Sequence, residues 1–275
     1  MNYDIPTGTE TGTETGMDRF RAAVRHGRAE AMLTGLAALS LHRLATAPRP
    51  DLIERIDILV PRTRRPRSTD RVRVVRTARP PLPVEIDGLP VAPVERALAD
   101  AVAQPADADT VRRLLTEAVG GGHCEPGVVV RELSRARLLG RPQVAAAVDV
   151  LLTEGRALAE QRLYAMVRRC GLPDPLWNVD LRLPGGPHLG ALDAYWPAQA
   201  VAVELDTRAA RRDEDALDAA YTRKREHLER LGVTVVRLSP RGLREARDQQ
   251  ATVVRTALMA AADRPPAAHV VVLPR

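Results

Sequence analysis

The sequence predicts two domains: an α+β domain in the first half and an α/β domain with a mixed sheet flanked by helices in the second. The chain has 275 residues, more than the roughly 100–200 of a typical single domain. Beyond residue 150 the apolar periodicity predicts a helix, three strands, a helix, a strand and a final helix. Hydrophobic residues make up 45% of the chain, which is enough for a core although only 3% of residues are aromatic.

The first half combines helical stripes with short alternating or apolar runs. An apolar stripe predicts helix over 18–44, interrupted near Gly27 and Gly35, with Thr34 as the cap of its second part. Further strands are predicted over 56–60, 72–76, 84–88 and 89–91, and helices over 93–103, 107–119 and 128–137.

The second half has longer elements. Helices are predicted over 154–170, 213–231 and 240–262, and strands over 178–183, 189–195, 200–205 and 233–238. A Gly-Pro-containing linker over 138–142 separates the halves. We therefore predict a disordered tail over 1–16, a first domain over 17–140, a second over 150–262 and a C-terminal tail over 263–275.

Charge and cysteine content narrow the classes of protein. The net charge of +6 favours a polyanionic partner, nucleic acid first. No run of about 18 apolar residues is present, which predicts no membrane span, and the absence of a charged-then-apolar leader predicts a cytoplasmic protein. Cys124 and Cys170 form no CxxC pair and each of the six histidines stands alone, so we expect no zinc.

Carboxylates on consecutive strands form the most informative pattern. Asp193 and Glu204 lie on strands joined by a short turn, and Asp206 shares the face of Glu204 if its strand continues. Converging carboxylates repel one another unless a cation neutralises them. Mg²⁺ is the oxygen-preferring cation of such sites, where it activates water and stabilises charge on a phosphate. The alternative is that these acids are ordinary strand-end residues paired with arginines.

Residues of the second half resemble the Vsr-like (very-short-patch-repair endonuclease-like) domains of the PD-(D/E)XK superfamily over about 155–260. Glu160 matches the Glu of the family's helix, and Asp193 matches the Asp of its strand. The segment Glu204-Leu205-Asp206 matches the hairpin motif. Lys224 lies in the segment that matches the charged helix, and residues 231–238 match the last strand. The resemblance implies a restriction-endonuclease-like fold and Mg²⁺-dependent hydrolysis of DNA. In that interpretation Asp193 and Glu204 bind the metal, Asp206 assists, and Glu160 completes the metal shell or orients a water. The charge on the scissile phosphate is offset by Arg211, Lys224 or Arg225.

Three departures from the family pattern keep a second function open. Thr207 stands where the family usually has Gly, residues 208–212 contain no His where the family commonly has one, and Asp206 stands in place of the consensus Lys. The alternative is a non-catalytic transcriptional regulator, or a type IV antitoxin-like protein, that retains the nuclease fold.

Part of the first half resembles the middle region of AbiEi-type antitoxin and regulator proteins. The segments that look alike are 32–39, 58–61 and 88–100. In actinobacteria such regions often precede a Vsr-like domain. This resemblance implies DNA as one partner and a toxin or another protein as a further partner.

Arginines supply candidate contacts to nucleic acid, because their guanidinium groups suit phosphate geometry. The candidates are Arg62, Arg64, Arg65, Arg67, Arg211 and Arg212. The first four equally fit an exposed loop, since no aromatic residues are interleaved with them. Arg211 and Arg212 fit better in a surface helix rich in salt bridges.

Overall fold

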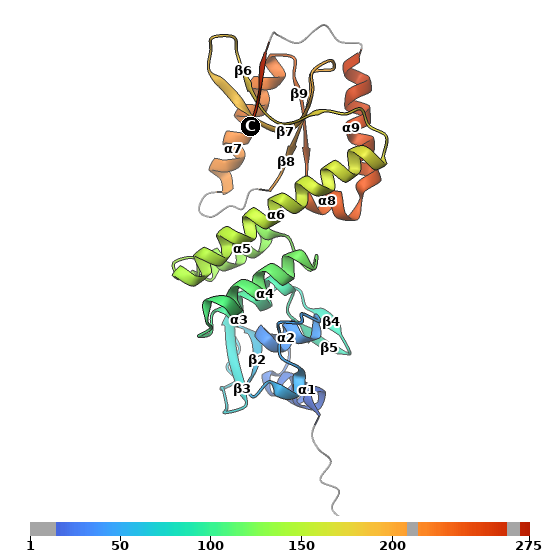
Figure 1. Ribbon diagram of the computed structural model, residues 1–275. Coiled ribbons are helices and arrows are strands. Elements are labelled where there is room, and N and C mark those ends of the chain that lie inside the picture. Colours follow the sequence, from blue (N-terminus) through green and yellow to red (C-terminus); the bar gives the residue numbers. More distant parts are fainter. Residues whose placement is uncertain (1–14, 208–213, 263–269) are drawn as a thin grey trace, which may run out of the picture. The chain divides into compact units, whose positions relative to one another are not determined.

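The computed structural model describes residues 15–207, 214–262 and 270–275, with two compact units, Met1–Glu117 and Ala118–Arg275 (Figure 1). Each unit contains a five-stranded mixed sheet with helices, so the predicted mixed α/β class is confirmed. The segment 118–140, assigned from the sequence to the first domain, lies in the second unit. No helix of the described ranges has both the length and the apolar character needed to cross a membrane.

Unit 1 has the strand order β3-β2-β1-β5-β4, with parallel pairing between β2 and β3 and between β1 and β5. Its elements are α1 (Gly16–Gly27), β1 (Met32–Thr34), α2 (Gly35–Leu41), the 3-10 turn η1 (Pro50–Leu52), β2 (Ile56–Pro61), β3 (Val72–Thr77), β4 (Val84–Ile86), β5 (Leu89–Val91), α3 (Val94–Val102) and α4 (Ala108–Gly120), the last of which extends into unit 2. The predicted strands β2 to β5 are confirmed.

The start of unit 1 differs from the predicted helix over 18–44. Strand β1 separates α1 from α2, and its central Leu33 is completely buried between β2 and β5. Thr34 occupies the N-cap position of α2, but its hydroxyl donates to Asp100 Oδ2 at 2.6 Å instead of capping the helix. The three-residue strand is too short for a period-two signal, which explains why the helical stripe dominates the sequence pattern.

Unit 2 has the strand order β10-β6-β7-β8-β9, antiparallel except for the β8–β9 pair. Its elements are α5 (Pro126–Arg135), α6 (Pro142–Arg169), β6 (Leu176–Arg182), β7 (His188–Trp196), β8 (Val201–Leu205), α7 (Glu214–Arg230), β9 (Thr234–Leu238), α8 (Pro240–Glu245), α9 (Arg247–Ala262) and β10 (Val271–Pro274). The predicted succession of helix, three strands, helix and strand is confirmed as far as β9.

Three boundaries in unit 2 differ from the prediction. The linker over 138–142 ends at a helix start, because Pro142 takes the first-turn position of α6, where its missing N–H costs nothing. The predicted final helix is two helices that break at Ala246. The predicted C-terminal tail contains β10, which pairs antiparallel with β6.

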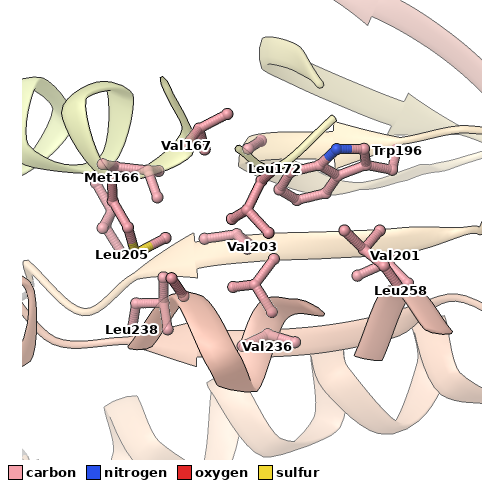
Figure 2. Packing of buried hydrophobic residues seen from close by; sticks show 14 of the residues in the cluster. Met166, Val167, Leu172, Trp196, Val201, Val203, Leu205, Val236, Leu238 and Leu258 are labelled. Atoms are coloured by element: carbon pink, nitrogen blue, oxygen red, sulfur yellow. The ribbon is translucent and has the colours of Figure 1, made fainter. Parts of the chain in front are cut away.

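The sheet of unit 2 is covered by apolar residues on both faces. One cluster joins α6, β7, β8, β9 and α9 around Met166, Trp196, Val203 and Leu258, as Figure 2 shows. The other cluster contains Leu228 of α7. Helices α6 and α7 therefore contribute to different layers, and each approaches the sheet from its own side.

Candidate functional site

Strands β7 and β8 pair through Trp196↔Val201, Tyr195↔Ala202 and Ala194↔Val203. At the next position Asp193 Oδ2 accepts a hydrogen bond of 2.6 Å from the backbone N–H of Leu205. The side chain of Asp193 thus replaces the next backbone hydrogen bond between the two strands, and it links the end of β8 to β7. This rim of the sheet brings together most of the acids predicted from the sequence.

Arg156 of α6 holds two of these acids. Its Nη2 donates to Asp193 Oδ1 at 2.5 Å, and its Nε lies 2.9 Å from Glu160 Oε1, one helical turn further along. Asp193 is 4% exposed, and both of its oxygens accept a hydrogen bond from a described group. Charge-assisted bonds of this kind are what stabilise a carboxylate that has been removed from water.

Lys224 of α7 forms an ion pair with Glu204, the second buried acid of this rim. Its Nζ lies 3.2 Å from Glu204 Oε1 and donates to the carbonyl oxygen of Ala191 at 2.8 Å. The neighbouring Gly190 has φ +141, and a Cβ at that position would collide with Lys224 Cε. Lys224 of α7 therefore reaches Glu204 of β8 through space that is free because Gly190 has no side chain.

Asp206 follows the end of β8 and interacts with β9. Its Oδ1 lies 2.7 Å from Arg237 Nη2, and its N–H donates to the carbonyl oxygen of Leu238 at 2.8 Å. The Arg237 guanidinium also lies over the Tyr221 ring, 4.4 Å from its centroid. Asp206 is thus tied to a cation of the neighbouring strand, separate from the Arg156 pair.

Each of the two buried acids of this rim is bound by a side-chain cation. Arg156 of α6 pairs with Asp193, and Lys224 of α7 pairs with Glu204. Mg²⁺ would need several oxygen ligands at about 2.1 Å around one point. Among the residues that the structure describes, no group of three His, Cys, Asp or Glu side chains could hold a metal ion.

The predicted nucleic-acid contacts divide into two groups. Arg62, Arg65 and Arg67 are exposed in the loop between β2 and β3, whereas Arg64 of the same loop lies 3.0 Å from Glu30. Arg211 and Arg212 lie outside the described residues.

The sequence pattern missed Arg156, which links Glu160 to Asp193. The available signal was the four-residue spacing from Arg156 to Glu160 on one helix, a spacing that places two side chains on the same face. No protein-family model, curated protein or solved structure matches this chain.

Proposed function

We propose that this protein is a DNA-binding regulator whose second unit has a restriction-endonuclease-like arrangement and does not hydrolyse DNA. The supporting observation is the carboxylate of Asp193, whose oxygens accept from Arg156 and from the Leu205 N–H. Arg156 provides at this acid the positive charge that a catalytic metal ion would provide in a nuclease.

The local charge supports a non-catalytic site. Glu160, Asp193 and Glu204 carry three negative charges, and Arg156 and Lys224 bring two positive charges within ion-pair distance of them. A metal-binding site of carboxylates keeps an excess of negative charge that attracts the ion. Here most of that excess is already compensated by side chains.

The order of the elements supports the nuclease-like arrangement. Glu160 lies on α6, Asp193 on β7 and Glu204 on β8, and these are followed by the charged helix α7 and by β9. This is the order that the Vsr-like resemblance implies. Fold and order do not establish chemistry, however, so the proposed absence of catalysis rests on the side-chain contacts of Asp193.

One observation favours Mg²⁺-dependent phosphodiester hydrolysis as a second candidate function. Lys224 lies beside Glu204, as the resemblance implies for a lysine that offsets charge on a phosphate. That function requires Arg156 to move away from Asp193, because its guanidinium is hydrogen-bonded to one of the two carboxylate oxygens of Asp193.

The two functions are separated by a cleavage assay on duplex DNA with Mg²⁺ or Mn²⁺. The wild type, Glu204→Gln and a control, Glu229→Gln in the exposed pair with Arg225, are compared. We expect salt-sensitive binding and no cleavage by any of the three proteins. Cleavage by the wild type and the control that is lost in Glu204→Gln would establish the second function, and absence of DNA binding at low salt would refute the first.

A further inference from the structure

The net positive charge of the chain is concentrated in one short segment. Residues 62–79, which we call the basic edge, contain eight arginines and one acid, Asp70. The rest of the chain carries 33 basic and 34 acidic side chains, a net charge of −1, out of 41 and 35 in total. The net charge of +6 therefore arises in the basic edge, and a generally arginine-rich composition does not account for it.

The basic edge lies at one side of the sheet of unit 1. It consists of the loop after β2, the strand β3 and the residues that follow, and β3 is the terminal strand in the order β3-β2-β1-β5-β4 (Figure 1). Arg71, Arg76 and Arg79 are exposed, as are the four arginines of the loop. The arginines of the loop, of β3 and of the residues that flank β3 are therefore accessible to a ligand, and Arg76 lies next to the loop because its side chain bonds to Pro66.

Hydrogen bonds hold the loop in one conformation. Thr69 N–H donates to the Val72 carbonyl at 2.8 Å, and Ser68 Oγ accepts from Val74 N–H at 3.0 Å. The side chain of Arg76 donates to the carbonyl oxygen of Pro66 at 2.6 Å. A preformed loop loses less conformational freedom on binding than a flexible one, which favours affinity.

Nearby acids neutralise only part of this charge. Arg73 pairs with Asp57 across the two strands at 2.6 Å, and Arg64 pairs with Glu30 at 3.0 Å. Arg62, Arg65 and Arg67 have no acidic partner within the described part of the chain.

We propose that the basic edge binds the phosphate backbone of duplex DNA. This inference rests on the proposed DNA-binding function and assigns that function to a surface of unit 1. Guanidinium groups match phosphate oxygens, and neutralising several phosphates releases counterions. Residues 62–79 contain no aromatic side chain that could stack on unpaired bases, so duplex is the preferred form, with little dependence on sequence.

The test compares two triple variants of the full chain, each of which loses three positive charges. Arg62→Ala/Arg65→Ala/Arg67→Ala alters the basic edge, and Arg112→Ala/Arg135→Ala/Arg241→Ala alters exposed helical arginines elsewhere. Binding to a labelled duplex is followed by fluorescence anisotropy over a series of NaCl concentrations. Thermal unfolding of each variant verifies its fold, and Arg65→Ala replaces the triple variant if that one does not fold.

We expect the slope of log K against log[NaCl] to become shallower by about 3 in the basic-edge variant, or by about 1 in Arg65→Ala. The affinity of the triple variant at about 0.1 M salt should fall on the order of 100-fold, and the control should stay near the wild type. Equal binding by both triple variants would overturn the inference and leave the proposed function intact. A wild type that binds polyglutamate or single strands in preference to duplex would also overturn it, whereas a wild type that binds no DNA would refute the proposed function itself.

Discussion

The guanidinium of Arg156 lies 2.5 Å from the carboxylate of Asp193, a residue that is almost inaccessible to water. The same guanidinium contacts Glu160 on its own helix, so one cation joins α6 to β7 at the point where β7 and β8 stop pairing. A side chain in this position has a structural role and an electrostatic one, and substitutions can separate the two.

Arg156→Ala should lower the free energy of unfolding by about 2 kcal/mol. Removing one partner of a buried pair leaves an uncompensated charge, and the effect is moderated here because Arg156 is 39% exposed. Arg156→Lys retains the charge and should lose less. Urea denaturation of the three proteins measures the difference.

Divalent cations provide a second measurement on the same variants. If Arg156 stands in place of a metal ion, the melting temperature of Arg156→Ala should rise with Mn²⁺ concentration, because a ligand that binds only the folded state stabilises it. The wild type and Arg156→Lys should not respond. A wild type that Mn²⁺ stabilises strongly and EDTA destabilises would contradict the proposed non-catalytic site.

Gly190→Ala should destabilise unit 2 by more than about 1 kcal/mol. The new Cβ would meet Lys224 Cε, and φ +141 is unfavourable for any residue with a side chain. Adding Lys224→Ala removes the collision but not the backbone strain, so the two substitutions should be less than additive in a double-mutant cycle. Strict additivity, measured by urea denaturation, would show that the lysine does not occupy this gap.

Apolar periodicity was sufficient to place most helices and strands around the site. The run Val201–Leu205 predicts a buried strand, and β8 is completely buried on both faces. Strand β10 was missed although residues 270–273 form a short apolar run, because so short a run does not identify a strand without its long-range partner β6. The start of α6 was missed because Pro142 also fits the end of a preceding element.

The candidate site was predictable only in part. Spacing placed Asp193 and Glu204 on neighbouring strands, and the structure has them on β7 and β8. The cation that each acid meets was not predictable, because the chain contains 40 arginines and any of them could serve as a partner. The pairing depends on how α6 and α7 pack against the sheet, which is a tertiary property.

Thr34→Val should lower the free energy of unfolding of unit 1 by about 1–2 kcal/mol. Asp100 is buried and accepts from the Thr34 hydroxyl at 2.6 Å and from Arg96 at 2.8 and 2.9 Å. Valine has nearly the same shape as threonine but provides no donor to this carboxylate. Thr34→Ser retains the hydroxyl and should stay closer to the wild type in urea denaturation. Equal losses in the two variants would mean that the methyl group, and not the hydrogen bond, is responsible.

Asp107 should contribute stability that depends on pH in a defined direction. Its carboxylate accepts from the Thr110 hydroxyl at 2.7 Å and from the Thr110 N–H at 2.9 Å at the start of α4. The hydroxyl bond, followed by the backbone bond, lowers the pKa of Asp107 below its ordinary value of 3.8. A lowered pKa in the folded state stabilises the fold above the unfolded-state pKa, and this contribution is lost as pH falls through the folded-state pKa.

Asp107→Ala should therefore melt at a lower temperature than the wild type at neutral pH, and the difference should shrink as the pH falls below about 3.8. Asp107→Asn still accepts from Thr110 but does not ionise, so it should melt close to the wild type at neutral pH and gain on it in acid. Thermal melts of the three proteins between about pH 3 and pH 7 measure these differences. If the difference in melting temperature between the wild type and Asp107→Ala stays constant across this range, the ionised carboxylate is not the group that stabilises the start of α4.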